Sequence, residues 1–308
     1  EVRQVVRQRL DLMGGLTVES LSDHLSDLAC LLLRHSLALT WARLPTRHRE
    51  APSFAIIGYG KLGGKELGYE SDLDLIFLYD DEAPEASENY ARLAQRLNGS
   101  IGSHTAAGQL YETDLRLRPD GASGLLVSRI ESFETYQRGA AWPWEHQALT
   151  RARFVAGDTA LGARFEALRH EILRLPRDIP ALRAEVIAMR KKMRDGHPNA
   201  SGLFDVKHDP GGIVDVEFTV QFLVLAHAAT HPELTGNIGN IALLKLMATL
   251  GLIPAELGVP AGDAYREYRR RQHALRLRGE RYARVVPEGL ERERETVLGL
   301  WGAVFGDH

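Results

Sequence analysis

Two aspartates at the start of an apolar run are the residues of this sequence best suited to metal chemistry. Asp72 and Asp74 are separated by one leucine, and the run Leu73–Tyr79 is otherwise apolar. Alternate side chains of a β-strand point to one face, so the two carboxylates are expected to project together. Carboxylates held side by side repel each other, and oxygen ligands of this kind suit Mg²⁺ or Mn²⁺. The spacing therefore predicts a divalent-cation site.

A glycine-rich loop leads into this pair of aspartates. It follows a second short apolar run, Phe54–Ile57, which has the length of a strand. The glycines of the loop are Gly58, Gly60, Gly63, Gly64 and Gly68. A glycine-rich loop beside a divalent cation is a suitable place for a nucleoside triphosphate.

The loop also matches the dinucleotide-binding fingerprint, with Gly58, Gly60 and Gly63 in the three glycine positions and Asp80 or Asp81 as the ribose-binding acid. That fingerprint requires a full helix after the third glycine and then a crossover to a parallel strand. Only eight residues, 64–71, separate the third glycine from the first aspartate. No crossover helix fits into that length, so the interpretation is rejected.

Two further alternatives concern the same stretch. The phosphate-binding P-loop pattern fails because Gly64-Lys65 is followed by Glu66 rather than by Ser or Thr. The aspartates would also be inert on a solvated strand edge. The apolar residues on both sides of the pair argue against that alternative.

A second cluster of charges lies in the segment Leu110–Leu117, which alternates like a third strand. The alternation places on one face Glu112, Asp114, Arg116 and Arg118. Asp114 is expected to supply a third metal carboxylate from a neighbouring strand. Arg116 and Arg118 are expected to meet phosphate oxygens with their planar, forked donors. The alternative is a ladder of cross-strand ion pairs on a wet sheet face.

One pattern in this stretch resembles the nucleotidyltransferase superfamily with the polymerase-beta-like fold. In that pattern a glycine is followed by eleven residues and then by Asp-x-Asp at the start of a strand, and Gly60, Asp72 and Asp74 fit this spacing. Lys61 stands where the superfamily usually has a second small residue. The fuller string GYGKLGGKELGYESDLDLIF resembles the glutamine synthetase adenylyltransferase family, whose bifunctional members add AMP to glutamine synthetase and remove it. The later strings YETDLRLRPDGASGLLVS, WEHQALTRARFVAGD and KHDPGGIVDVEF strengthen this resemblance, which covers at least residues 54–217.

The resemblance implies a set of site residues. Asp72, Asp74 and Asp114 would be catalytic and would bind the metal. Nucleotide binding would involve Gly60, Lys61, Gly63, Gly64, Ser71, Arg116 and Arg118. A segment that faces the nucleotide site in the family adds Lys207, Asp215 and Glu217. For Asp215, compensation of a helix dipole is the alternative. The charges of Glu145, Arg151 and Arg153 would orient phosphate or the acceptor protein, or form surface pairs.

The implied reaction is transfer of AMP from ATP to a tyrosine hydroxyl of glutamine synthetase, by two-metal in-line displacement with release of pyrophosphate. The rival within the family is the half that removes AMP by phosphorolysis. GYESDLDL is closer to the adding half, because the removing half tends to read ELN-x-SSDIDL. An alternative from another class is a nucleotide-sensing module without turnover. The presence of all three aspartates argues against it, because a sensor can lose a metal ligand and still bind. The resemblance also suggests the PII signal protein as a regulatory partner.

Composition sets the broad class of the protein. The chain has 308 residues, of which 44% are hydrophobic and 26% charged, as expected for a globular protein of two domains. Its net charge of −3 gives no electrostatic case for nucleic-acid binding. The single cysteine, Cys30, cannot form a disulfide within the chain, which suits a reducing cytoplasm. No apolar run approaches the roughly 20 residues that span a bilayer, and no signal peptide is visible. A start at Glu1 suggests a piece of a longer protein.

The pattern of elements predicts an α+β fold. An N-terminal helical segment is expected over residues 1–50, a nucleotidyltransferase domain with a small mixed sheet over 51–157, and an all-helical domain over 158–308. Within the middle domain, helices are predicted at Asn89–Thr105 and at Trp142–Val155 from their apolar spacing.

Overall fold

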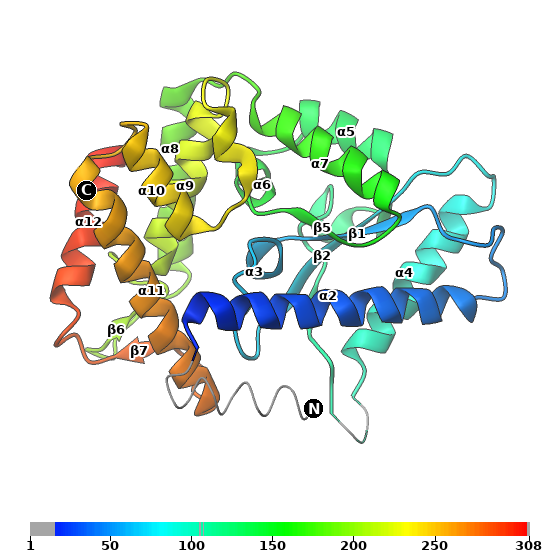
Figure 1. Ribbon diagram of the computed structural model, residues 1–308, viewed down its shortest axis with the longest axis horizontal. Coiled ribbons are helices and arrows are strands. Elements are labelled where there is room, and N and C mark those ends of the chain that lie inside the picture. The colour runs from blue at the N-terminus through cyan, green and yellow to red at the C-terminus, as the bar shows by residue number, and fades with distance from the viewer. Residues whose placement is uncertain (1–15, 105, 107, 307–308) are drawn as a thin grey trace. The chain divides into compact units, whose positions relative to one another are not determined.

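The computed structural model describes residues 16–104, 106 and 108–306 (Figure 1). The chain divides into two compact units, Glu1–Ile172 and Leu173–His308. The helix expected before residue 16 lies outside the described residues. Mixed helix and sheet are both present, so the α+β class is confirmed.

The first unit contains a small sheet and helices of varied length. Its helices are α2 (Val18–Ala42), α3 (Gly60–Gly63), α4 (Ala86–Gly102), α5 (Ile130–Gly139), α6 (Pro143–Leu149) and α7 (Thr159–Leu173), with a 3₁₀ turn η1 (Gly121–Ser123). Its strands are β1 (Phe54–Gly58), β2 (Leu73–Tyr79), β3 (Thr113–Asp114), β4 (Val127–Arg129) and β5 (Arg153–Gly157).

The sheet is mixed, with the strand order β3-β2-β1-β5 and β4 beside β2. Strand β1 runs antiparallel to both β2 and β5, whereas β3 and β4 run parallel to β2. All five residues of β1 are buried. The antiparallel pairing of β1 with β2 excludes the dinucleotide-binding fold, because that fold requires a parallel crossover between these strands.

The third strand is shorter than the sequence predicts. Instead of Leu110–Leu117, only Thr113 and Asp114 pair with β2. The reason is that β3 and β4 share one edge of β2: β3 pairs at its start and β4 at its end. The chain must leave the edge after Asp114, and it turns through η1 before returning as β4.

The predicted helix over Trp142–Val155 is wrong in its second half. Helix α6 ends at Leu149, and the chain then enters β5. Strand β5 completes the sheet by pairing with β1. Val155, the last residue of the predicted helical face, is therefore buried in a strand.

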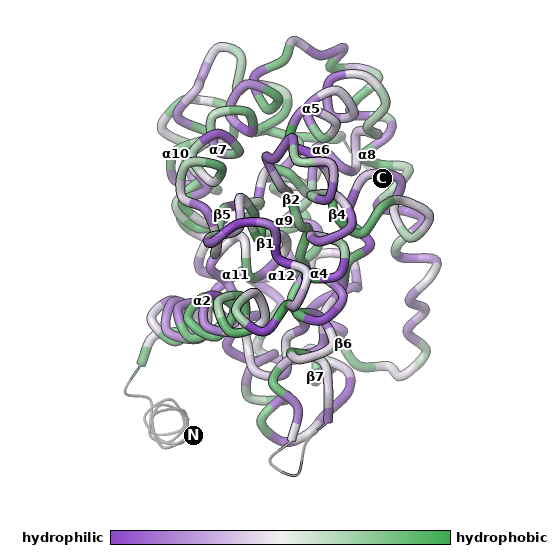
Figure 2. Tube along the Cα trace, turned by 90° about the vertical axis from the view of Figure 1, so that its right-hand side faces the viewer, coloured by the Kyte–Doolittle hydropathy of each residue, from purple (hydrophilic) through white to green (hydrophobic). Residues whose placement is uncertain are grey.

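Helix α2 covers this unit with one apolar face. Its buried side chains recur at helical spacing and include Leu21, Leu25, Leu33, Leu37 and Trp41. In Figure 2, where α2 is seen nearly along its axis, polar and apolar segments alternate around the helix. Thr17 caps its first turn by accepting a hydrogen bond from the Ser20 amide. Trp41 stacks on Tyr90 of α4, with ring centroids 5.7 Å apart.

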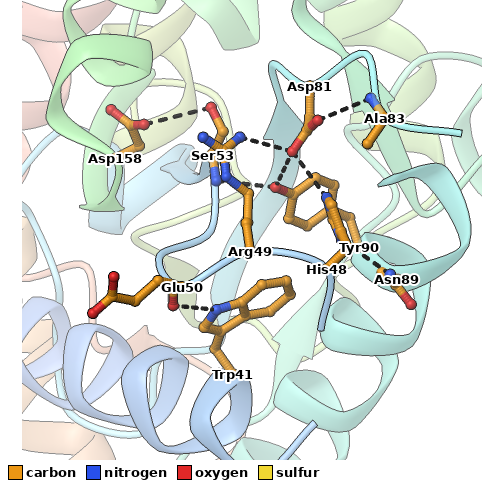
Figure 3. A network of polar contacts seen from close by, with 10 residues as sticks. All are labelled: Trp41, His48, Arg49, Glu50, Ser53, Asp81, Ala83, Asn89, Tyr90 and Asp158. Atoms are coloured by element: carbon orange, nitrogen blue, oxygen red, sulfur yellow. Dashed lines mark hydrogen bonds and ion pairs between the residues drawn. The ribbon is translucent and has the colours of Figure 1, made fainter. Parts of the chain in front are cut away.

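A polar network around Asp81 fastens the segment before β1 to helix α4 (Figure 3). The Asp81 carboxylate accepts hydrogen bonds from Arg49 Nη1 and from the Tyr90 hydroxyl, both at 2.8 Å, and His48 Nε2 lies 3.0 Å away. Burial alone would raise the pKa of Asp81, but hydrogen bonds from the Ala83 amide, His48 and Arg49 lower it overall. Asp81 is therefore a structural anchor and not a ribose-binding acid.

Helix α7 packs within the first unit. Phe165 lies against Phe133 of α5, with ring centroids 5.9 Å apart. The buried guanidinium of Arg169 donates to the carbonyl oxygens of Leu149 and Thr150. The division between the two compact units falls between Ile172 and Leu173, at the end of α7. The domain boundary expected from the sequence at residues 157 and 158 stays a prediction.

The second unit is mainly helical. Its elements are α8 (Ile179–Asp195), β6 (Phe204–Asp205), α9 (Ile213–His227), η2 (Pro232–Gly236), α10 (Asn240–Thr249), α11 (Ala255–Leu277), β7 (Arg284–Val285) and α12 (Glu291–Phe305). Helix α9 is buried along most of its length and packs against α8, α10, α11 and α12. The antiparallel pair β6 and β7 corrects the expectation of helices alone. Among the described helices, none has the length and apolarity that crossing a membrane requires.

Candidate functional site

Three carboxylates converge at one end of strands β2 and β3. Asp72 immediately precedes β2, and Asp74 is the second residue of that strand. Asp114 is the direct register partner of Asp74 on the parallel strand β3. One oxygen from each carboxylate lies within 4.8 Å of the other two. The structure therefore brings together the three aspartates named from the sequence, while their role as ligands stays a prediction.

The electrostatics of this cluster fit a divalent cation. Burial, together with the neighbouring charges of Asp72 and Asp114, raises the pKa of Asp74 to about 6. Lys61 and Arg151 offset only part of this effect. An all-carboxylate donor set with excess negative charge is the chemistry that Mg²⁺ and Mn²⁺ prefer.

Arg116 forms an ion pair with one member of the cluster. Its guanidinium donates to both carboxylate oxygens of Asp114, and the Arg116 amide also donates to Asp114 Oδ1 at 2.8 Å. These contacts hold the pKa of Asp114 below its usual value. The Arg116 side chain is 79% exposed. It lies in the turn after β3 and not on the strand face where the sequence placed it.

Arg118 is directed toward the turn itself. Its guanidinium donates to the carbonyl oxygens of Leu115, Ala122 and Gly124 at distances of 2.7, 2.9 and 3.2 Å. Arg118 thus holds the two ends of the turn together. It would have to release these carbonyls before it could meet a phosphate.

Gly60 lies directly against the carboxylate cluster. Its φ is +52°, in the left-handed region where side chains are disfavoured. A Cβ atom on Gly60 would lie 2.1 Å from Asp74 Oδ2. Both observations require glycine, and they place the backbone of the loop beside the predicted metal ligand.

The next two glycines of the loop serve packing. The amide of Gly63 donates to the Tyr59 carbonyl at 2.8 Å, and that of Gly64 donates to the Gly60 carbonyl at 3.0 Å. A Cβ on Gly63 would lie 1.9 Å from the Arg151 carbonyl oxygen, and one on Gly64 would lie 2.8 Å from Arg151 Nε. These two amides are therefore engaged within the turn of α3, whereas the sequence assigned them to phosphate.

A buried ion pair lies beneath the glycine loop. Arg151 Nη2 donates to Glu66 Oε2 at 2.6 Å, and the two side chains are only 10% and 8% exposed. From the sequence, Arg151 is expected to contact phosphate or the acceptor protein or to form a surface pair, and no sequence pattern singles out Glu66. Their separation of 85 residues conceals the pairing. The pair joins the loop after α3 to the segment before β5.

Ser71 and Lys61 meet at the other side of the loop. Ser71 is 8% exposed and accepts a hydrogen bond from the Gly68 amide at 3.1 Å. Lys61 Nζ donates to Ser71 Oγ at 3.4 Å. Ser71 thus closes the turn that precedes Asp72, which positions the start of β2.

The remaining candidates belong to the second unit. Asp215 is buried, accepts a hydrogen bond from the Gly211 amide at 2.6 Å and pairs with Arg190. Glu217 accepts a hydrogen bond from the Tyr265 hydroxyl at 3.1 Å. The backbone amide of Lys207 donates to Asp205 in the loop before α9. A function for these residues in nucleotide binding stays a prediction.

The small mixed sheet, with a glycine turn and three carboxylates at one end, is that of a nucleotidyltransferase-like α+β domain. Residues 3–168 match the family model described as Glutamate-ammonia ligase adenylyltransferase. The chain belongs to this family, and the membership predicted from the sequence strings is confirmed. Residues 181–303 match the family model described as GlnD PII-uridylyltransferase.

Curated relatives agree with this family. The chain is 62% identical over 296 residues to the bifunctional glutamine synthetase adenylyltransferase/adenylyl-removing enzyme of Aromatoleum aromaticum, covering 96% of this chain and 31% of that protein. The proteins of the same description from Bordetella bronchiseptica and Nitrosomonas eutropha are 59% and 56% identical, again over 96% of this chain and over 32% and 34% of their own lengths. The chain therefore spans about a third of the length of these relatives.

Proposed function

We propose that this chain transfers AMP from ATP to a tyrosine hydroxyl of glutamine synthetase and releases pyrophosphate. The observation that carries the proposal is the convergence of Asp72, Asp74 and Asp114 beside the Gly60 turn, in a member of the adenylyltransferase family. The substrate follows from the names of the relatives, which describe enzymes acting on glutamine synthetase.

Asp72, Asp74 and Asp114 would hold Mg²⁺ or Mn²⁺. Bound there, the cation supplies positive charge that offsets the charge of the phosphate oxygens during displacement. The aspartates themselves fix where the α-phosphorus of ATP must lie. The backbone at Gly60 provides close approach, since no side chain stands between it and Asp74.

The proposed displacement is in line. A bond forms between the tyrosine oxygen and the α-phosphorus, and the bond from that phosphorus to the bridging oxygen of the β-phosphate breaks. Pyrophosphate leaves with the electron pair. Arg116 keeps Asp114 ionised by lowering its pKa. When the Arg116 guanidinium turns from Asp114 to the leaving group, a carboxylate oxygen of Asp114 becomes free to accept the hydroxyl proton.

Arg116 is the proposed contact to the leaving group. Its side chain is exposed, and its forked donors already engage a carboxylate in two-pronged geometry. Phosphate oxygens accept the same geometry. Arg118 is proposed to shape the turn that carries Arg116, since its donors are directed at backbone carbonyls.

The direction of transfer is supported by the string Gly68–Leu75, which is closer to the adding half of the family. The test is incubation of the chain with Mg²⁺, glutamine synthetase and ATP labelled at the α-phosphate, followed by peptide mapping. The proposal expects label on a tyrosine and release of pyrophosphate. Release of ADP from adenylylated glutamine synthetase and phosphate, without labelling from ATP, would assign the removing activity instead. Regulation by the PII signal protein stays a prediction.

A further inference from the structure

The second unit contains a small pocket that the proposed reaction does not use. Its volume is about 80 Å³, and it lies among helices α8, α9 and α12. The wall includes Arg190, Lys191 and Arg194 of α8, Asp215 of α9 and Trp301 of α12. Ile187 and Pro210 complete the wall, so three of its seven residues are cationic, which is unusual for a cavity formed between packed helices.

Arg190 is the central donor of this pocket. It is only 5% exposed, and its charge is balanced by an ion pair from Nε to Asp215. Its Nη2 donates to the His208 carbonyl at 2.9 Å. Its Nη1 is buried and has no hydrogen-bond partner among the described residues. Buried N–H groups are nearly always paired, so this donor indicates an acceptor that binds in the pocket.

Two further cations line the pocket. Lys191 and Arg194 are exposed, and within the described residues no acidic group pairs with either of them. Asp215 is the acidic residue of the pocket wall, and its carboxylate already pairs with Arg190 and accepts a hydrogen bond from the Gly211 amide. The pocket wall therefore carries an excess of positive charge, supplied by three residues of α8.

We propose that this pocket binds a phosphoryl oxyanion, either free orthophosphate or a phosphate group of a nucleotide. A tetrahedral oxyanion has enough acceptor oxygens to give a separate one to each of Arg190 Nη1, Lys191 and Arg194. A carboxylate has only two oxygens and would have to share one between two of these donors. The volume accommodates a single phosphate group and not a nucleoside. Asp215 then has the role of orienting Arg190. The proposal is independent of the direction of adenylyl transfer, because it involves none of the three aspartates of the first unit.

The test is calorimetric titration of the complete 308-residue chain with orthophosphate, in EDTA so that no divalent cation contributes. Saturable binding is expected. Lys191→Ala and Arg194→Ala should each weaken it by about tenfold, the loss expected for one charge-assisted hydrogen bond. The matched control is Lys192→Ala, which removes an exposed cation of the same helix that is absent from the pocket wall. Its affinity should equal that of the unaltered chain.

Substitution of Arg190 is a poor test because Arg190 also belongs to a buried ion pair. The test therefore uses the Lys191 and Arg194 variants, and circular dichroism verifies that they fold.

Repeating the titration with ATP present identifies the source of the phosphate. Competition assigns the pocket to a nucleotide phosphate, and its absence assigns it to the free anion. The proposal is overturned if orthophosphate does not bind saturably, or if Lys192→Ala weakens binding as much as Lys191→Ala does.

Discussion

Gly60 and Asp74 lie so close together that a Cβ atom on the glycine would be 2.1 Å from Oδ2 of the aspartate. The loop and the carboxylate cluster are therefore built as one unit, although eleven residues lie between Gly60 and Asp72 and thirteen between Gly60 and Asp74. A glycine at this position allows the backbone to approach a charged group that any side chain would displace. The effect of this close contact on activity can be measured separately from the effect of backbone strain on stability.

Gly60→Ala should reduce adenylyl transfer by about 100-fold, because even a shift of about 1 Å in a catalytic group has effects of this size. The positive φ alone should cost roughly 1–2 kcal/mol of folding stability. The matched control is Gly251→Ala, at φ +69° with no atom within 4 Å of the added Cβ. This control should show the same strain and no loss of transfer. Steady-state rates and urea unfolding measure the two effects; equal activity in both variants would contradict the account.

The raised pKa of Asp74 predicts a pH-dependent stability in the metal-free chain. Its pKa lies near 6 in the folded state, against an ordinary value of 3.8. The folded state therefore favours the protonated carboxyl, and stability is lost as pH rises from the ordinary value of 3.8 to about 6. In EDTA at pH 7.5, Asp74→Asn should be more stable than the unaltered chain by about 1–3 kcal/mol.

At pH 3 this difference should nearly vanish, because Asp74 is then protonated in both the folded and the unfolded state. Urea unfolding at the two pH values measures it. The comparison with Asp74→Asn cancels the contributions of other titrating groups. If both proteins show the same change in unfolding free energy between the two pH values, the electrostatic description of the cluster is wrong.

The buried pair of Arg151 and Glu66 should be critical for the loop. Glu66→Gln keeps the shape of the side chain but removes the buried charge that pairs with the Arg151 guanidinium, which should cost about 3 kcal/mol of unfolding free energy. The control is Glu88→Gln, which removes one partner of the exposed i,i+4 pair with Arg92 and should cost less than about 0.5 kcal/mol. Denaturant unfolding of both variants checks this. Equal, small losses would show that the buried pair does not hold the loop.

The two arginines after β3 should separate into different roles. Arg116→Lys keeps the charge but loses the forked donor, so kcat/KM for ATP should fall by about tenfold with the fold unchanged. Arg118→Lys should chiefly lower the thermal midpoint, because three carbonyl oxygens lose their donor.

The exposed Arg96→Lys serves as the control for both measurements. Kinetics at saturating glutamine synthetase and thermal unfolding distinguish the roles. Normal kinetics in Arg116→Lys would reduce Arg116 to a surface partner of Asp114.

Much of the sheet was predictable because its strands carry strong local patterns. Strand β2 has the bounds that the apolar run indicates, and β1 extends the predicted run by one residue. Helix α4, predicted at Asn89–Thr105, is found at Ala86–Gly102. In each case burial of a continuous apolar face decides the structure, and that face can be read from the sequence.

The errors arise where pairing between distant segments decides the structure. Val155 continues the helical apolar spacing of the preceding residues, but the segment that contains it, β5, pairs with β1 about 100 residues earlier in the chain. The alternation of residues 110–117 is real, but β4 occupies the remaining edge of β2. The Asp74–Asp114 register and the Arg151–Glu66 pair likewise depend on tertiary contacts that no local pattern encodes.

The most direct test of the central claim compares label transfer from ATP to glutamine synthetase by the unaltered chain and by Asp74→Asn, in the presence of Mg²⁺. Asp80→Asn is the control, since Asp80 pairs with Arg164 outside the carboxylate cluster. The account predicts Mg²⁺-dependent labelling by the unaltered chain and by Asp80→Asn, and none by a folded Asp74→Asn. Full Mg²⁺-dependent labelling by Asp74→Asn would contradict it.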